Sequence, residues 1–178
     1  QPYSRVATAI ARVSFPVFAN VQDNSELLRR GYLKTIVSVA LAAWPLLCGM
    51  LIFGENIIRW VRPDLMPALE AFQILVLTSV CKTVGTVVGS IYLAKGKAHW
   101  AFRFTLFSLA AMLPGLYWGT AYGPAGIAAA LFGLSVFFLI VSQYLVNRLI
   151  DLSFAAYLRA LARPLAVALL VLMVLAFY

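Results

Sequence analysis

Charge is what this sequence most lacks. Charged side chains make up only 11% of its 178 residues, whereas an ordinary globular domain has about 25%. Hydrophobic residues make up 63%, and long apolar runs follow one another with short polar breaks. This composition excludes a water-soluble domain. Because a membrane-spanning helix needs about 20 apolar residues, the runs predict an all-α polytopic membrane protein, built as an antiparallel transmembrane helix bundle.

The residues that perform catalysis are also scarce. The sequence has one histidine, two cysteines and six acidic residues, and the acidic residues all lie in loops or near the ends of apolar runs. Motifs such as HExxH, GxSxG or a glycine-rich phosphate loop do not occur in it. Cys48 and Cys81 lie inside apolar runs, and we interpret them as small buried hydrophobic residues. We expect no enzyme activity, no catalytic or metal-binding residue and no cofactor.

The apolar runs predict a series of spans, at residues 2–18, 32–53, 68–94, 100–120, 125–146 and 164–178. Residues 152–163 alternate charged and apolar side chains, which is typical of a helix that lies in the membrane interface. Pro164 then suits the first turn of the last span. That last run has about 15 residues, fewer than a span needs, and the chain starts without a signal peptide. We therefore expect a fragment of a longer protein.

Local signals mark the ends and interior of some of these helices. Asp23 with Glu26 three residues later resembles a capping box at the start of the second span. Pro45 lies inside that span and predicts a kink. Apolar pairs around Trp60 indicate a short interfacial helix in the loop that follows. Ser142 and Gln143 could form hydrogen bonds between helices.

Basic residues gather in alternate loops. Because lysine and arginine are retained on the cytoplasmic side, the first, third and fifth loops should be cytoplasmic. The net charge of +8 then reflects membrane topology and lipid contacts, and we expect no nucleic-acid binding. Aromatic residues should mark the outer interface at Trp60, Trp118 and Tyr122 and the inner one at Tyr92 and Trp100.

One charge interrupts an otherwise uncharged apolar stretch. Lys82 lies near the middle of the run from Ala71 to Ala94, where a cation costs about 2.5 to 3.5 kcal/mol. We expect Lys82 to face an aqueous cavity and not to snorkel, because either interface is about 12 residues away. On a helical period it shares one stripe with small and polar residues, namely Thr78, Ser79, Gly85, Thr86 and Gly89.

This stripe predicts two roles. Its polar members Thr78 and Thr86 are expected beside Lys82 on the wall of the cavity. Gly85 and Gly89 form a GxxxG pair, which permits close contact between helices. The alternative without a cavity is that the whole stripe only packs against a neighbouring helix.

Arg5 and Arg12 are the other cations expected at membrane depth. They lie two turns apart on one helical face, and guanidinium groups match the oxygens of phosphate or pyrophosphate. For Arg12, a position in the interface with its side chain reaching the headgroups is an equal alternative.

The residues from Arg12 to Asp23, RVSFPVFANVQD, followed by Glu26 to Leu33, ELLRRGYL, resemble bacterial polysaccharide flippases. These are the Wzx-type exporters of the multidrug/oligosaccharidyl-lipid/polysaccharide (MOP) superfamily, and the match is to their C-terminal half. Weaker matches cover nearly all of the chain, among them FGE at 53–55, LAKGK at 93–97 and YLR at 157–159. The chain departs from the family pattern at Ala19 and Asn20, where serine and arginine are usual.

The resemblance implies one lobe of a two-lobed transporter of about 12 to 14 helices that works by alternating access. Its substrate would be an anionic oligosaccharide linked to undecaprenyl pyrophosphate, moved across the bacterial inner membrane for surface polysaccharide synthesis. Lys82, Arg5 and Arg12 match a cationic lumen that receives the pyrophosphate. Membrane lipids and a polysaccharide polymerase are the implied partners.

Other readings stay open at this point. The chain could come from another MOP transporter, a peptidoglycan-precursor flippase or a multidrug antiporter, although a cation antiporter should have carboxylates inside the membrane. An integral-membrane enzyme that modifies glycans would need a catalytic acid or histidine beside a long external loop. A scaffold subunit without a transport path would tolerate loss of Lys82.

Overall fold

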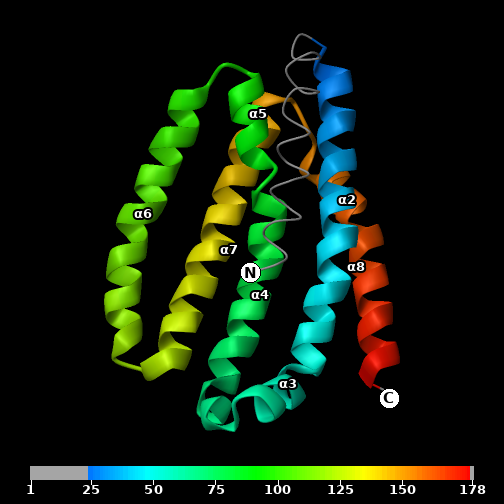
Figure 1. The fold of residues 1–178 in the computed structure, drawn as a ribbon. Coiled ribbons are helices and arrows are strands. Elements are labelled where there is room, and N and C mark those ends of the chain that lie inside the picture. The colour runs from blue at the N-terminus through cyan, green and yellow to red at the C-terminus, as the bar shows by residue number, and fades with distance from the viewer. Residues whose placement is uncertain (1–23, 177–178) are drawn as a thin grey trace.

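The computed structural model describes residues 24–176, which form helices joined by short connections, with no β-strand in that range (Figure 1). The predicted span at 2–18, with Arg5 and Arg12, lies outside the described residues. The helices are α2 (Ser25–Ile52), α3 (Gly54–Val61), the 3-10 helix η1 (Pro63–Ala68), α4 (Leu69–Gly85), α5 (Val88–Ala94), α6 (Ala98–Thr120), α7 (Gly123–Leu149) and α8 (Phe154–Ala176).

Four stretches are long and apolar enough to cross a membrane: Ser25–Ile52, Pro63–Ala94, Gly123–Leu149 and Phe154–Leu175. They confirm a helical multi-pass membrane protein. Helix α6 is not among them, although its 23 residues would reach across the hydrocarbon core. Arg103 near its start and the polar aromatic and glycine residues near its end lower its hydropathy.

Long helices that follow one another along the chain run in opposite directions, so their connections gather at two ends of the bundle (Figure 1). One end holds the start of α2, the α5–α6 turn and the α7–α8 connection, and basic side chains collect at or near it: Arg29, Arg30, Lys34, Lys95, Lys97, Arg103, Arg148 and Arg159. The opposite end holds α3, η1 and the α6–α7 turn, with charged residues of both signs: Glu55, Arg59, Arg62, Asp64 and Glu70. We call these the basic end and the mixed end.

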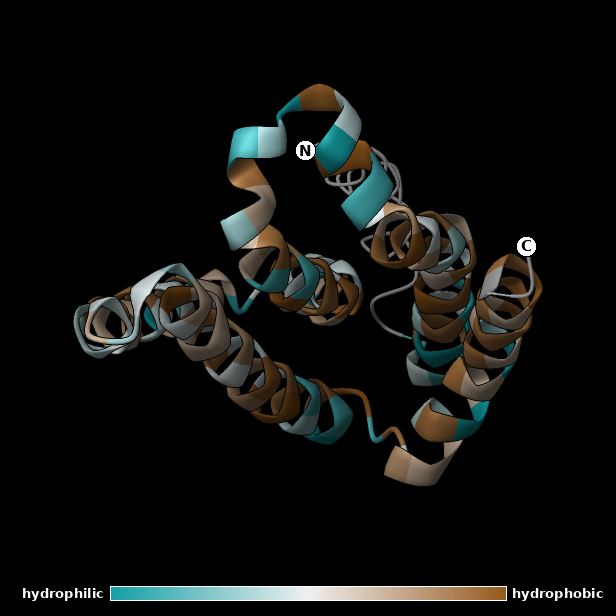
Figure 2. Cartoon of the chain, turned by 90° about the horizontal axis from the view of Figure 1, so that it is seen from below, coloured by the Kyte–Doolittle hydropathy of each residue, from teal (hydrophilic) through white to brown (hydrophobic). Residues whose placement is uncertain are grey.

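The hydrophobic core lies between α2, α4, α5, the last half of α7, and α8. Its largest buried side chains include Tyr32, Leu47, Ile91 and Ile150. Viewed along the bundle, α6 lies at one edge beside α7, with α2 and α8 on the other side (Figure 2). Consistent with this position, α6 packs against α7 and, near its start, α5. One flank of the bundle is therefore attached mainly through the contact of α6 with α7.

A buried chain of hydrogen bonds ties α2 to α7 inside this core. The hydroxyl of Tyr32 donates to Oε1 of Gln143 at 3.0 Å, and Nε2 of Gln143 donates to Oδ1 of Asn147 at 2.7 Å. Tyr32 and Gln143 are 0% and 1% exposed, so neither polar group can turn to water instead. This confirms the expected interhelical bond of Gln143. Ser142 contributes through its backbone, because its carbonyl accepts from the hydroxyl of Tyr92 at 3.4 Å.

We expect Tyr32→Phe to destabilise the folded protein by about 1 kcal/mol, because it leaves the buried Gln143 amide oxygen without a donor. Unfolding of the purified full-length protein in detergent would measure this. Tyr144→Phe is the matched control, since Tyr144 neighbours Gln143 in sequence, is 64% exposed and has no hydrogen bond to a described residue. Equal stabilities of the two variants would contradict the role of this network.

Glycines bring α6 and α7 into backbone contact. A Cβ built on Gly119 would lie 2.8 Å from Cα of Ile127 and 3.0 Å from the carbonyl oxygen of Gly126. A Cβ on Gly126 would lie 2.6 Å from the carbonyl oxygen of Gly119, and one on Gly115 would lie 2.8 Å from a methyl group of Leu134. Gly115 and Gly119 form a GxxxG pair that the sequence analysis missed, and they set the angle at which α6 leaves α7.

Gly119→Ala should therefore force the two backbones apart and cost about 1 to 3 kcal/mol, measured as a loss of thermal stability in lipid nanodiscs. Gly133→Ala on α7 is the matched control, because a Cβ there meets no described atom within 4 Å. A Gly119→Ala protein as stable as Gly133→Ala would show that α6 is not held by this contact.

The predicted division of the last part of the chain was wrong. It separated an interfacial helix at 152–163 from a last span that begins at Pro164. Residues 152–163 are not a separate interfacial helix, because α8 runs without a break from Phe154 through Pro164. Two of the apolar side chains in this range pack on the core, with Leu152 5% and Tyr157 4% exposed, whereas Phe154 and Leu158 are each 53% exposed. Helix α8 packs along α2. This packing outweighs the backbone hydrogen bond that proline removes.

The cap of α2 also differs from the prediction. Asn24 is the N-cap, and its side-chain oxygen accepts from the backbone N–H groups of Glu26 and Leu27, both at 3.1 Å. Glu26 pairs with Arg30 one turn later and does not close a capping box. Asp23, the expected cap, lies outside the described residues. Farther along, α2 continues through Pro45 to Ile52.

Candidate functional site

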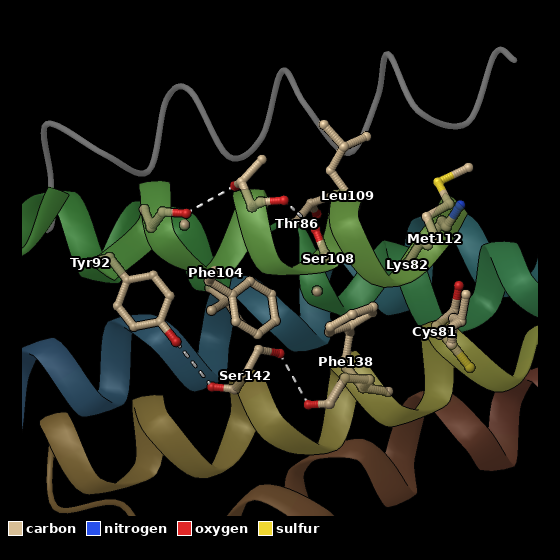
Figure 3. A pocket seen from close by; sticks show the side chains of 18 of the residues that line it. Cys81, Lys82, Thr86, Tyr92, Phe104, Ser108, Leu109, Met112, Phe138 and Ser142 are labelled. Carbon is tan, nitrogen blue, oxygen red and sulfur yellow. Dashed lines mark hydrogen bonds between the residues drawn. The ribbon is translucent and has the colours of Figure 1, made fainter. Parts of the chain in front are cut away.

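A cavity of about 620 Å³ lies between α4 and α5 on one side and α6 and α7 on the other (Figure 3). Its space arises because α6 packs on α7 and leans away from α4 (Figures 1 and 2). The stripe of α4 and α5 that faces this space carries small residues. Apart from the neighbouring backbone of its own helix, no described atom lies within 4 Å of a Cβ built on Gly85 or Gly89.

The close helix packing expected at the two glycines stays a prediction. Gly85 and Gly89 line the cavity, and no helix from α2 to α8 packs closely against them. The opposite face of α4 and α5 is buried in the core, with Val84, Val87 and Ile91 at most 2% exposed. Within residues 24–176, the small and polar stripe of this segment therefore faces the cavity and the apolar face is buried in the core.

Lys82 lies on the wall of this cavity (Figure 3). Its side chain is exposed, and it forms no hydrogen bond or ion pair with any residue from 24 to 176. It is about 12 residues, or roughly 18 Å of helix, from either end of the 69–94 segment. A charged ammonium group at that depth needs water or an anion as its partner, and the cavity is the place where either can reach it.

The helix that carries Lys82 loses its regular hydrogen bonding one turn later, although Thr86 and Val87 keep right-handed helical dihedral angles. Helix α4 ends at Gly85 and α5 begins at Val88, although the sequence predicts a single span there. The hydroxyl of Thr86 donates to the carbonyl of Thr83 at 2.7 Å, and the N–H of Ser90 bonds the carbonyl of Val87, three residues back, at 3.2 Å. A side-chain bond such as that of Thr86 competes with the regular helical pattern. The backbone hydrogen bonding beside Lys82 is therefore locally irregular.

The predicted hydroxyl partners of Lys82 divide between two environments. Thr86 lines the cavity. Thr78 does not: it is 2% exposed, and its hydroxyl donates to the carbonyl of Ile74 at 2.9 Å. Thr78 shares the stripe but lies one turn closer to the mixed end, where α4 is packed between α2 and α7. Ser79 is buried at the same level.

The other walls come from α6 and α7, and the sequence analysis did not predict them. They add hydroxyl groups to the cavity from Thr105, Ser108, Ser135 and Ser142. The remaining surface is mainly apolar, and the ring of Phe138 packs edge-to-face on Phe104 with centroids 5.6 Å apart. A polar stripe at helical spacing on α6, Thr105 with Ser108, was the signal that could have identified this wall.

The site has a defined chemical character. One cation and hydroxyl groups from three helices face a largely apolar space, and no acidic residue is among the described lining residues. No group of histidine, cysteine, aspartate and glutamate that could hold a metal ion occurs between residues 24 and 176. The arrangement can attract an anion, and the apolar walls strengthen that attraction by lowering the local dielectric constant.

Cys81 provides a native probe of this cavity. It lines the cavity, whereas Cys48 on α2 packs against the hydrophobic core. In full-length protein retaining only one of these cysteines, a membrane-impermeant thiol reagent should modify Cys81 much faster than Cys48, as mass spectrometry would detect. Equal, slow modification of both would contradict a water-filled cavity.

The sequence of this chain is similar to those of several known proteins. Residues 1–62 match the family described as "Polysaccharide biosynthesis protein". The lipopolysaccharide biosynthesis protein WzxC of Escherichia coli K12 is 26% identical over 92% of this chain and 34% of its own length. The teichuronic acid biosynthesis protein TuaB of Bacillus subtilis is 25% identical over 92% of this chain and 34% of its own length.

A membrane protein of the cps region of Klebsiella pneumoniae is 27% identical over 84% of this chain and 33% of its own length. The chain thus spans about a third of the length of these curated relatives. No solved structure matches it. The matches confirm the resemblance to Wzx-type proteins on which the expectations from the sequence rest.

Proposed function

We propose that this chain is part of the C-terminal lobe of a flippase for lipid-linked oligosaccharides in a bacterial inner membrane. The cavity between α4, α6 and α7 would receive the anionic pyrophosphate end of the substrate as it passes from the cytoplasmic to the periplasmic leaflet. The observation that carries the proposal is the position of Lys82, exposed on the wall of a mid-span cavity and without a carboxylate partner among the described residues.

The composition of the cavity supports an anionic, hydroxyl-rich cargo. Lys82 offers a positive charge, and the hydroxyl oxygens of Thr86 and Ser108, whose protons are donated to backbone carbonyls, can accept hydrogen bonds from the hydroxyl groups of a glycan. A cation-exporting antiporter of the same superfamily would need an acidic residue facing its cargo, and a glycan-modifying enzyme would need an acid or histidine there. The described lining has neither, which favours the flippase over both alternatives.

The interrupted helix supports movement at this site. Transporters commonly build their substrate sites near the middle of the membrane from discontinuous helices, because irregular backbone there can line a cavity. The α4–α5 interruption lies one turn from Lys82. In a two-lobed bundle, rocking of this lobe against the other would expose the cavity alternately to the two sides of the membrane.

Lys82→Ala in the full-length gene should reduce surface polysaccharide by about tenfold or more in a strain that lacks its own flippase, because a charge-assisted contact worth about 1.5 to 3 kcal/mol is lost. Lys82→Arg should retain much more export than Lys82→Ala. Lys34→Ala is the matched control, since Lys34 is exposed on α2 and does not line the cavity. Expression of each variant must be matched by immunoblotting.

Normal polysaccharide from Lys82→Ala at matched expression would overturn the anion-binding cavity and favour a scaffold role. Equal loss in Lys82→Ala and Lys34→Ala would show that export responds to charge in general and not to this site.

A further inference from the structure

A second cavity of about 370 Å³ lies at the basic end, between the first turn of α6 and the last turns of α7. Its lining has a distinct composition: Lys97, Trp100, Leu145, Arg148 and Leu149. No residue lines both this cavity and the one beside Lys82. We propose that this second cavity binds the phosphate headgroup of an anionic membrane phospholipid.

The electrostatics of the cavity favour a phosphate. Lys97 and Arg148 approach it from two helices, and no acidic side chain is on its wall within the described chain. Arg148 is exposed and has no hydrogen bond or ion pair to residues 24–176, so its guanidinium fork is free to bind two phosphate oxygens. Lys97 is also the N-cap of α6, whose first turn has no side-chain cap, and this adds a favourable helix dipole.

The aromatic ring fixes one of the two cations. The Nζ atom of Lys97 lies 4.8 Å from the centroid of the Trp100 ring, a cation–π contact that restrains a flexible side chain. Tryptophan is enriched at the level of lipid headgroups. The contact therefore holds the ammonium group at the depth where a lipid phosphate lies.

The apolar part of the lining favours a lipid over a soluble phosphate. Leu145 lies about one turn deeper along α7 than Arg148 and Leu149, so the cavity changes from basic to apolar toward the middle of the bundle. The first turns of α6 also expose apolar side chains, with Phe102 68% and Leu106 55% exposed. A phospholipid can place its phosphate at the cations and its acyl chains along these apolar residues. Free phosphate has no apolar part that could pack against them. Basic pockets between helices are known to recognise anionic lipids in this way.

Native mass spectrometry of the full-length protein, titrated with phosphatidylglycerol or phosphatidylcholine of the same acyl chains, tests this proposal. The wild-type protein should bind one phosphatidylglycerol more tightly than phosphatidylcholine. Lys97→Gln and Arg148→Gln should each weaken that binding by about fivefold, and the double variant by about 30-fold, as expected for two cations near an anionic headgroup. Arg159→Gln, an exposed charge near the same end and off the lining, should not change it.

Three further outcomes are decisive. The charge-preserving exchange Lys97→Arg with Arg148→Lys should keep the preference for phosphatidylglycerol, which separates charge from folding. An equal affinity of wild type for both lipids, or full binding by the double glutamine variant, would overturn the site. Displacement of the lipid by millimolar inorganic phosphate would assign the cavity to a soluble anion and overturn the lipid assignment. The site does not depend on the proposed transport function, and loss of export in Lys82→Ala would leave it intact.

Discussion

The side chain of Lys82 must be hydrated, and the hydrocarbon interior of a bilayer offers no water. A lysine in the middle of an apolar span is stable only if the protein keeps an aqueous space beside it or supplies an anionic partner. Within the described chain there is no such partner, and the space is the cavity between α4, α6 and α7. The arrangement of the neighbouring helices follows from the need to keep that space open.

Two kinds of contact maintain it. On one side, a compact core with the Tyr32–Gln143–Asn147 hydrogen bonds holds α2, α7 and α8 together, and α4 packs on α2 and α7. On the other side, α6 packs on α7 through its glycine contacts and through Phe104 and Phe107 on Phe138, and it stays away from α4. The small residues of the α4–α5 stripe then leave room for solvent or cargo. A compact group of helices with α6 held at a distance from α4 can enclose a site that opens and closes during transport.

The sequence predicted much of this because membrane proteins obey strong, simple constraints. Apolar run length located α2, the α4–α5 segment and α7, and the charge pattern predicted which loops share an end. The helical period brought Lys82 and Thr86 to one wall. The helical period does not predict the depth at which neighbouring helices separate. Thr78 lies below that depth and is buried. Tyr92, expected at the inner interface, is only 2% exposed and bonds to α7.

Other differences have the same physical origin. A proline such as Pro164 is tolerated inside a helix when packing on one face outweighs a lost hydrogen bond, and packing is not visible in a single sequence. Gly85 with Gly89 and Gly115 with Gly119 are identical motifs, yet the first pair faces a cavity and the second a backbone. Glycine permits close approach, but the partner decides whether it occurs. Only the three-dimensional arrangement separates the two uses.

The state of the Lys82 amine itself is the most direct test of this account. In full-length protein with ¹⁵N-labelled lysine in lipid nanodiscs, the Nζ resonance that disappears in Lys82→Arg should belong to a charged ammonium group whose protons exchange rapidly with water. A neutral amine, or an ammonium group protected from exchange, would show that the residue is sealed from solvent and would contradict the hydrated cavity.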